Sequence, residues 1–118
     1  MTKTRRHLEG LRVIDFSAVF AGPICARFLA DNGASVIKIE APVGGDVIRG
    51  PEGYSRLFNH FNAGKRGIAL NLAMTEAQEM AKELISDADV VIENYRPGIM
   101  KKYGLDYESL KEAFPKLV

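Results

Sequence analysis

The sequence predicts an α/β protein built on a mainly parallel β-sheet with helices packed against it. Four short apolar runs alternate with segments in which apolar residues recur at helical spacing. This alternation is typical of strand–helix–strand units, in which each helix connects two parallel strands. The four predicted strands cover residues 11–16, 35–40, 67–72 and 89–93.

The first two strands are expected to form one strand–helix–strand unit with a right-handed crossover. Pro23 suits the first turn of the intervening helix, because the N–H that proline lacks is not needed there. Gly33, after Asn32, is a typical helix stop. The large apolar residues of the helix fall on one helical face: Ile24, Phe28 and Leu29.

Residues 41–65 break the regular pattern with many glycines and prolines, although residues 55–61 could form a helical turn. A loop of this length inside a small domain is usually functional or mobile. A helix is then predicted over residues 75–86, and Thr75 with Gln78 has the spacing of a capping box.

The last part of the chain is predicted to hold two short helices. Gly104 ends the first, and Asp106 begins a second over residues 107–113. Residues 114–118 look like the beginning of another strand, so the sequence resembles the front part of a larger protein. We therefore expect residues 1–10 to be a tail and residues 11–118 to be a partial domain, incomplete at the C-terminus.

Composition excludes several broad classes of function. The chain has 118 residues, of which 47% are hydrophobic and 26% charged, and its net charge is +1, so nothing favours nucleic acid or an acidic membrane surface. No apolar run approaches the roughly 20 residues that cross a bilayer. No cluster of His, Cys or carboxylate residues has the spacing of metal ligands, so no metal site is predicted.

Cys25 is the only cysteine, which rules out a disulfide within the chain. A lone cysteine in a helix that packs on a sheet is expected to be buried, because free cysteine is among the most buried residue types. We expect a cytoplasmic or otherwise reducing compartment.

The strongest candidate site follows the fourth predicted strand. Asn94, Tyr95 and Arg96 lie directly after it, and ligands of open α/β sheets bind beyond the carboxyl ends of the strands. Tyr95 could stack on a base and Arg96 could bind a phosphate through two hydrogen bonds. The alternative is an ordinary loop with a half-buried tyrosine.

Two other segments are weaker candidates. Lys65 and Arg66 follow a glycine and could bind phosphate, or they could be the solvated tip of a loop. Ala21-Gly22-Pro23 begins a helix, where backbone N–H groups attract phosphate, but the Gly-x-Gly-x-x-Gly pattern of dinucleotide sites is absent. Glu40 alone is weak evidence for a ribose contact.

Taken in order, these segments resemble the class III CoA-transferase family, also called the CaiB/BaiF family. No single segment is decisive, and the resemblance covers the chain from Leu8 onward. The matching stretches are Leu8 to Ser17, Ala21 to Pro23, Leu29 to Glu40, Gly45-Asp46 with Arg49-Gly50, Asn62 to Arg66, Leu70 to Leu72, Asp89 to Gly98, Lys102 with Gly104-Leu105, and Phe114 to Leu117.

The resemblance implies an N-terminal, Rossmann-like, CoA-binding part of an acyl-CoA:carboxylate CoA-transferase that forms an interlocked homodimer. The substrates would be a CoA thioester and a carboxylic acid, with no tightly bound cofactor. The family's nucleophile is an aspartate that becomes acylated. It is expected beyond Val118, so this chain would hold no catalytic residue and would be inactive alone.

The resemblance also assigns CoA-binding residues. The principal ones are Leu70, Asn71, Leu72, Asn94, Tyr95, Arg96 and Lys102, and the weaker ones are Lys65, Arg66, Phe20 and Ala21.

Three positions depart from the family pattern. Lys102 and Ala41 stand where many members have arginine, and Phe20 stands where formyl-CoA transferases have a polar residue. The departures at Ala41 and Phe20 argue against formyl-CoA transferase itself. Two alternatives remain open: an α-methylacyl-CoA racemase-like enzyme of the same family, and a nucleotide-binding or assembly module without catalysis.

Overall fold

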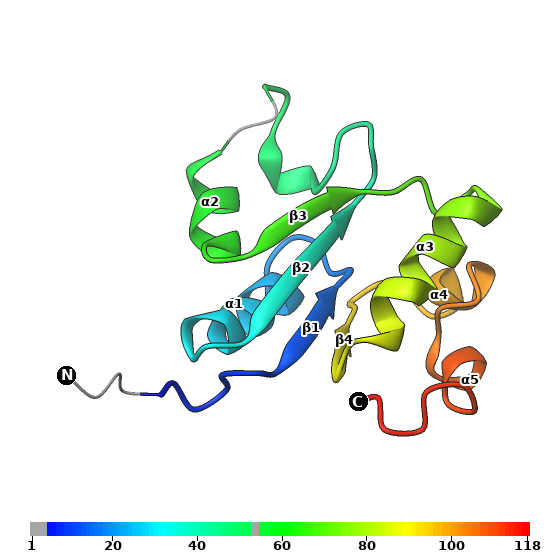
Figure 1. The fold of residues 1–118 in the computed structure, drawn as a ribbon. Coiled ribbons are helices and arrows are strands. Elements are labelled where there is room, and N and C mark those ends of the chain that lie inside the picture. Colours follow the sequence, from blue (N-terminus) through cyan, green and yellow to red (C-terminus); the bar gives the residue numbers. More distant parts are fainter. Residues whose placement is uncertain (1–4, 53–54) are drawn as a thin grey trace.

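The structure, a computed structural model, describes residues 5–52 and 55–118; residues 1–4 of the predicted tail lie outside the described part. It contains a four-stranded parallel sheet with helices on both sides (Figure 1). The α/β fold and the four predicted strands are confirmed, each strand being as long as predicted or shorter. The strands are β1 (Arg12–Asp15), β2 (Ser35–Glu40), β3 (Arg66–Ala69) and β4 (Val90–Ile92).

The strand order is β3-β2-β1-β4, so β2 lies on one side of β1 and β4 on the other. The chain passes from β1 to β2 on one side, and later crosses from β3 at one edge to β4 at the other. Ile14 of β1 lies level with Ile37 of β2 and Val91 of β4. In sheets of this kind, ligands bind at the carboxyl ends of the strands where the order reverses, which here lies between β1 and β4.

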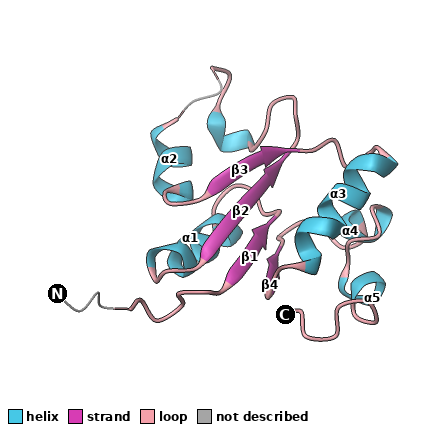
Figure 2. Cartoon of the chain, in the orientation of Figure 1, coloured by secondary structure: helices cyan, strands magenta, loops and turns pink. Residues whose placement is uncertain are grey.

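Helices cover both faces of the sheet (Figure 2). The first two pack together on one side, and the last three lie on the other. They are α1 (Ala21–Asp31), α2 (Arg56–Asn62), α3 (Thr75–Ser86), α4 (Ile99–Lys102) and α5 (Tyr107–Leu110), with a short 3₁₀ helix η1 (Val47–Arg49) in the loop after β2.

Each face of the sheet has its own apolar core. On the α1 side, Val13 and Val36 pack against small helix residues such as Ala26. On the α3 side, Ile14 and Ile39 pack against the helices that follow β3. Successive strand residues point to opposite faces, so a strand buried on both faces must be apolar throughout, which explains the short continuous apolar runs.

Of the three large apolar residues predicted to share one face of α1, only Leu29 packs against the core on this side of the sheet. The helix buries its small residues, Gly22, Ala26 and Ala30, together with Pro23, whereas Phe28 is 66% exposed. Small residues at every fourth position let the helix axis approach the sheet closely, and the larger side chains of Ile24 and Phe28 are left outside the core. Cys25 is accordingly exposed, contrary to the expected burial.

The predicted capping box at the start of α3 is also wrong. Thr75 is already inside the helix, and the N-cap residue, Met74, makes no side-chain capping bond. Asn71 instead forms a turn in which its side chain accepts a hydrogen bond from Ala73 N. The Gln78 amide donates to the Leu72 carbonyl, which fixes the approach to the helix.

The last described residue runs beside β4. Val118 N donates to the Asp89 carbonyl, and the Val118 carbonyl accepts from Val91 N, a parallel pairing outside the four assigned strands. Asp106 precedes α5 as predicted, but its carboxylate accepts from the Ser109 hydroxyl rather than from a backbone N–H of the helix.

Candidate functional site

Four buried charged side chains hold the loop between β1 and α1. Asp15 at the end of β1 pairs with Lys65, at 2.8 Å, and Lys38 of β2 pairs with Asp46, at 3.2 Å. All four side chains are almost fully buried. Ser17 connects the two pairs, because it donates to Asp15 and its carbonyl accepts from Lys38 at 2.6 Å. The cluster is neutral overall, which makes its burial tolerable.

Lys65 has three acceptors for its three N–H groups. Its Nζ lies 2.8 Å from Asp15 Oδ2, 2.8 Å from Asn62 Oδ1 and 2.9 Å from the Pro23 carbonyl. Burial lowers the pKa of Lys65 below its usual value, although the hydrogen bond from Lys65 to Asp15 acts in the opposite direction. With every donor engaged, the geometry favours a structural role for Lys65 over phosphate binding.

Val19 is held in a left-handed conformation, with φ of 69°. This conformation is unfavourable for a β-branched residue. Its amide N–H points to the Asp46 carboxylate, with nitrogen–oxygen distances of 3.1 and 3.2 Å. Strain of this kind persists only where the surroundings impose it, and here a buried carboxylate does so.

Asn94 holds the same loop from the side of β4. Its Oδ1 accepts from Ala18 N at 2.9 Å, and its Nδ2 donates to the Ala18 carbonyl at 2.8 Å. The amide therefore closes the crevice between the ends of β1 and β4 with two hydrogen bonds. The close packing extends to Gly22, where a Cβ atom would lie 2.1 Å from the Ser17 Cβ.

The loop after β2 folds back on the end of that strand through Glu40. Both Glu40 oxygens accept from the Arg49 guanidinium, at 2.7 and 2.8 Å, and Asp46 N donates to Glu40 Oε1 at 2.8 Å. The Arg49 guanidinium also lies 3.6 Å from the centre of the Phe58 ring. These contacts hold Asp46 in place beneath Val19.

The two principal predicted segments lie at the same edge of the sheet. Residues 70–72 follow β3 and residues 94–96 follow β4, and both leave the carboxyl ends of their strands. Three inter-strand spacings of about 4.8 Å put these ends roughly 14 Å apart. An extended ligand could contact both segments, whereas a small one could not.

The segment after β4 presents groups suited to an anionic, partly aromatic ligand. Tyr95 is exposed over 41% of its surface, and burial of the remainder, with Asp46 nearby, raises the pKa of its hydroxyl. Arg96 is exposed, and no described residue forms a hydrogen bond or ion pair with its guanidinium. Lys102, at the end of α4, has its Nζ 5.9 Å from the Tyr103 ring centre and is also exposed.

Other predicted residues are placed less favourably. The side chain of Leu70 is buried in the core, so only its backbone could face a ligand, and Leu72 is half-buried against the same core. Arg66 turns back to donate to Ser35 Oγ, at the amino end of β2, and does not join the carboxyl edge. Phe20 is 46% exposed and contacts Phe61 edge to face.

Ala21 is exposed at the start of α1, close to the loop that Asn94 holds. Asn71 is exposed, and its side-chain oxygen is already used in the turn that precedes α3. Both remain accessible at the carboxyl edge.

Sequence reasoning missed the buried charge cluster. Neither Asp15, Lys38 nor Asp46 was predicted as part of a site, although all three are buried. One signal was present: Lys38 interrupts the apolar strand Val36-Ile37-Lys38-Ile39, and a charge in a strand buried on both faces requires a partner. The partner itself could not be read from the sequence.

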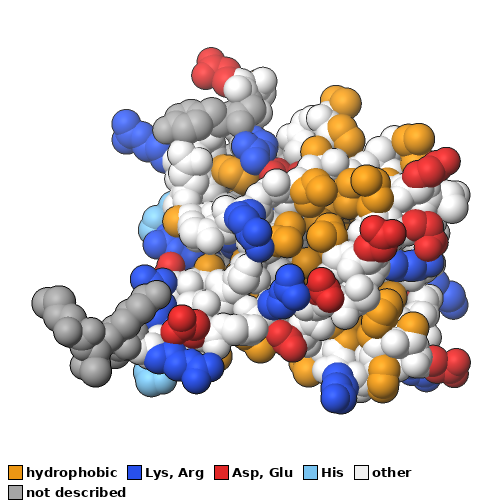
Figure 3. All heavy atoms as spheres, in the orientation of Figure 1, with side chains coloured by type: hydrophobic (Ala, Val, Ile, Leu, Met, Phe, Trp, Pro, Cys, Tyr) orange, Lys and Arg blue, Asp and Glu red, His pale blue; other side chains and the backbone are white. Residues whose placement is uncertain are grey.

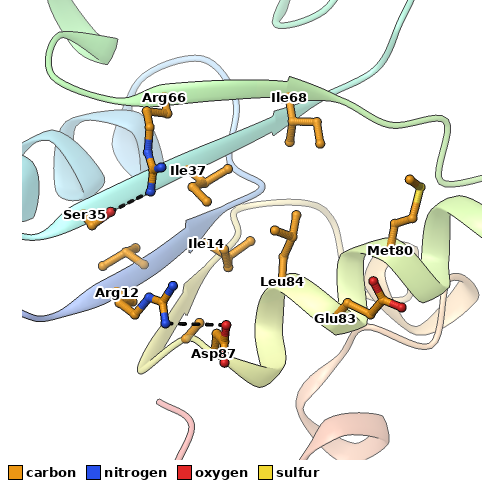
Figure 4. Close-up of a pocket in the computed structure, with 12 residues that line it drawn as sticks. Arg12, Ile14, Ser35, Ile37, Arg66, Ile68, Met80, Glu83, Leu84 and Asp87 are labelled. Carbon is orange, nitrogen blue, oxygen red and sulfur yellow. Dashed lines mark hydrogen bonds and ion pairs between the residues drawn. The ribbon is translucent and has the colours of Figure 1, made fainter.

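A separate apolar groove lies on the α3 side of the sheet. Its cavity of about 260 Å³ is lined by residues from β1 to β3 and by α3. Figure 3 shows hydrophobic side chains gathered in this region, and Figure 4 shows Ile37, Ile68 and Leu84 pointing into the space between the sheet and the helix. Arg66 and Glu83 border it, and none of the principal predicted residues lines it.

Within the described residues, no helix has the length and apolar character needed to cross a membrane. In the same part of the chain, no group of three or more His, Cys, Asp or Glu side chains could hold a metal ion.

Comparison with known proteins gives relatives over nearly the whole chain. The chain is 43% identical to succinyl-CoA:mesaconate CoA-transferase of Haloarcula marismortui, over 94% of its length and 30% of the relative's. It is also 43% identical to succinate–glutarate CoA-transferase of Agrobacterium fabrum, over 100% of its length and 32% of the relative's. The chain thus spans about a third of the length of these relatives.

A solved structure supports the same relationship. The CaiB/BaiF family protein of Brucella suis matches with a TM-score of 0.85 and 42% identity, over 92% of this chain and 31% of that protein. Residues 8–118 match the model of CoA-transferase family III, so the resemblance inferred from the sequence is confirmed. The chain therefore belongs to CoA-transferase family III.

Proposed function

We propose that this chain is the N-terminal, CoA-binding part of an acyl-CoA:carboxylate CoA-transferase. The observation that carries the proposal is the shared carboxyl edge of the sheet. There, the exposed guanidinium of Arg96 lies beside Tyr95, with the segment after β3 roughly 14 Å away by strand spacing. CoA is long enough to span that distance, and its nucleotide part carries both a purine ring and phosphates.

Each residue has a distinct role in this proposal. Tyr95 stacks on the base, Arg96 binds phosphate with two parallel hydrogen bonds, and Lys102 adds a positive charge nearby. Asn94 acts mainly by holding the loop at Ala18, although its amide keeps one further N–H for a ligand. Asn71 and the backbone of Leu70 and Leu72 contact the other end of the nucleotide.

The chemistry is proposed to take place on residues outside this chain. A downstream aspartate would attack the thioester carbonyl, release the CoA thiolate and become acylated as an anhydride. The thiolate would then attack the aspartyl carbonyl and release the acid. The intact enzyme is proposed to be a cytoplasmic homodimer, and this chain alone is expected to bind CoA without turnover.

The test is a calorimetric titration of the 118-residue chain with CoA. Arg96→Ala should weaken binding by roughly 1–3 kcal/mol, the usual range for a hydrogen bond to a charged group. Arg12→Ala is the matched control, because Arg12 is an exposed arginine at the amino end of β1, the opposite edge of the sheet.

Equal losses in both variants would show nonspecific electrostatic attraction and remove Arg96 from the site. A wild-type chain that is folded by circular dichroism but does not bind CoA would contradict the proposal. It would leave an assembly role as the leading interpretation.

A further inference from the structure

A single peptide unit connects the loop after β2 to the segment after β4. It consists of the Ala18 carbonyl and the Val19 N–H. The carbonyl accepts a hydrogen bond from Asn94 Nδ2 at 2.8 Å, and the N–H points to the Asp46 carboxylate at 3.1 and 3.2 Å. A trans peptide is planar, and its carbonyl and N–H point in opposite directions. Asp46 and Asn94 therefore hold one rigid unit from opposite sides.

The conformation of Val19 makes this connection sensitive to Asp46. With a φ of 69°, Val19 lies in the left-handed region, which is unfavourable for a β-branched residue. Without an acceptor for its N–H, nothing in this contact would offset that cost. A return of φ to negative values rotates the peptide relative to the start of α1, and the Ala18 carbonyl then moves away from Asn94.

Asp46 is itself held firmly in place. Its carboxylate is buried and pairs with Lys38 at 3.2 Å, while its own N–H donates to Glu40 Oε1 at 2.8 Å. Its Oδ1 also accepts from Ile48 N at 3.2 Å, which caps the 3₁₀ helix η1. An acceptor fixed by several contacts can impose an unfavourable conformation on the residue that it binds.

The other end of the connection is the segment proposed to bind CoA. Asn94 uses both polar atoms of its side chain on Ala18, Oδ1 at 2.9 Å and Nδ2 at 2.8 Å. The exposed residues Tyr95 and Arg96 follow directly, so the orientation of Asn94 sets where this segment begins. Burial raises the pKa of the Tyr95 hydroxyl, and the negative charge of Asp46 raises it further, which shows that Asp46 lies near the segment.

We propose that Asp46 is a positioning residue for CoA binding, which acts through the Ala18–Val19 peptide on the segment from Asn94 to Arg96. Asp46 does not touch the ligand. The proposal rests on the proposed CoA site, but the connection belongs to the ligand-free chain and can be measured without CoA. In the competing interpretation, Asp46 only caps η1 and orders its own loop.

The first test separates the acceptor at position 46 from the buried ion pair. In a Lys38→Met background, Asp46→Asn keeps an oxygen acceptor for the Val19 N–H, whereas Asp46→Leu, of similar size, has none. Both double variants lack the two charges of the pair, so neither leaves one of them buried alone. In calorimetric titrations, CoA should bind roughly tenfold more weakly to the Asp46→Leu variant, which corresponds to the cost of one residue in the left-handed region.

Val19→Gly provides the rescue. Glycine adopts a positive φ without strain, so it does not need an acceptor to impose that conformation. Adding Val19→Gly to Lys38→Met/Asp46→Leu should restore most of the lost CoA affinity. A role confined to the cap of η1 predicts no recovery, because Val19 takes no part in that cap.

Backbone amide NMR spectra without CoA test the connection directly. The Tyr95 and Arg96 signals should differ between the two double variants, and Val19→Gly should reverse the change. Differences confined to residues 41–50 would overturn the proposal, as would equal CoA affinities of the two variants when the wild-type chain binds CoA. A folded wild-type chain that does not bind CoA would contradict the proposed function, and these spectra would then decide the role of Asp46 alone.

A reciprocal variant makes the test independent of substitutions at buried positions. Asn94 is exposed, so Asn94→Ala should leave the chain folded. Because coupling is reciprocal, it should move the amide signal of Ile48, which bonds to Asp46. Asn71→Ala, at an exposed asparagine after β3, is the matched control and should leave that signal in place. An Ile48 signal that does not respond to Asn94→Ala would overturn the proposal.

Discussion

Both carboxylate oxygens of Asp46 lie within hydrogen-bonding distance of the Val19 amide nitrogen, at 3.1 and 3.2 Å. Asp46 comes 27 residues after Val19 and is held by Lys38 on one side and by the Glu40 carboxylate, through its own N–H, on the other. The left-handed conformation of Val19 is thus imposed by a charge that is itself buried and paired.

Glycine should therefore be favoured over alanine at position 19. Both substitutions remove the two γ-methyl groups, and glycine lacks Cβ as well, but only glycine adopts a φ of 69° without strain. We expect Val19→Gly to be more stable than Val19→Ala by about 1 kcal/mol in urea unfolding. At Val47, in the 3₁₀ helix η1, the order should reverse, and the same order at both sites would show that Val19 is not strained.

A methyl group at Gly22 should disrupt the loop between β1 and α1. The added Cβ would lie 2.1 Å from the Ser17 Cβ, so the loop or the helix must move. We expect Gly22→Ala to reduce the free energy of unfolding by roughly 1–3 kcal/mol, as in other overpacked sites. Gly67→Ala, with nothing within 4 Å of the added atom, is the control and should be nearly neutral.

Removing the charge of Lys65 should destabilise the fold strongly. Lys65→Met leaves the buried Asp15 carboxylate without its ion pair, which typically costs roughly 3–5 kcal/mol. The double variant Asp15→Asn/Lys65→Met should recover part of this loss, because it removes the unpaired charge. Lys82→Met, which breaks an exposed pair with Glu79, should cost less than about 1 kcal/mol.

This comparison also separates the two roles considered for Lys65. A stable Lys65→Met variant with weakened CoA binding would support a phosphate contact and contradict the structural role.

Glu40 should make stability depend on pH in the acidic range. Burial alone would raise the pKa of its carboxyl group, but hydrogen bonds from the Arg49 side chain and the Asp46 backbone hold that pKa below the usual value of 4.5. The resulting stabilisation is complete above the pKa of the unfolded chain, and it is lost as the pH falls through the lower pKa of the folded state.

We therefore expect Glu40→Gln to be less stable than the wild type at neutral pH, with the difference narrowing below about pH 4.5. Urea unfolding at a series of pH values measures this difference. Glu79→Gln, at an exposed pair, should show no comparable change, and a constant difference between Glu40→Gln and the wild type would contradict the role of Glu40.

The sequence by itself determined the local elements. All four strands were predictable from short apolar runs, which burial on both faces explains for β1 and β2, although β3 is exposed along its whole length. The helix over residues 75–86 was predicted with its observed bounds. The position of Asn94, Tyr95 and Arg96 at the carboxyl end of a strand also followed from the sequence. Their role in binding CoA remains a prediction.

The tertiary structure decided how those elements use their side chains. Periodicity placed Ile24, Phe28 and Leu29 together on α1. The face that meets the sheet is instead that of Gly22, Ala26 and Ala30, because small residues permit the closer approach. Lys65 pairs with Asp15, which lies 50 positions earlier in the chain. Asn94 forms its hydrogen bonds with Ala18, 76 positions earlier. Such pairs arise only when the strand order brings distant ends together, so no local pattern could reveal them.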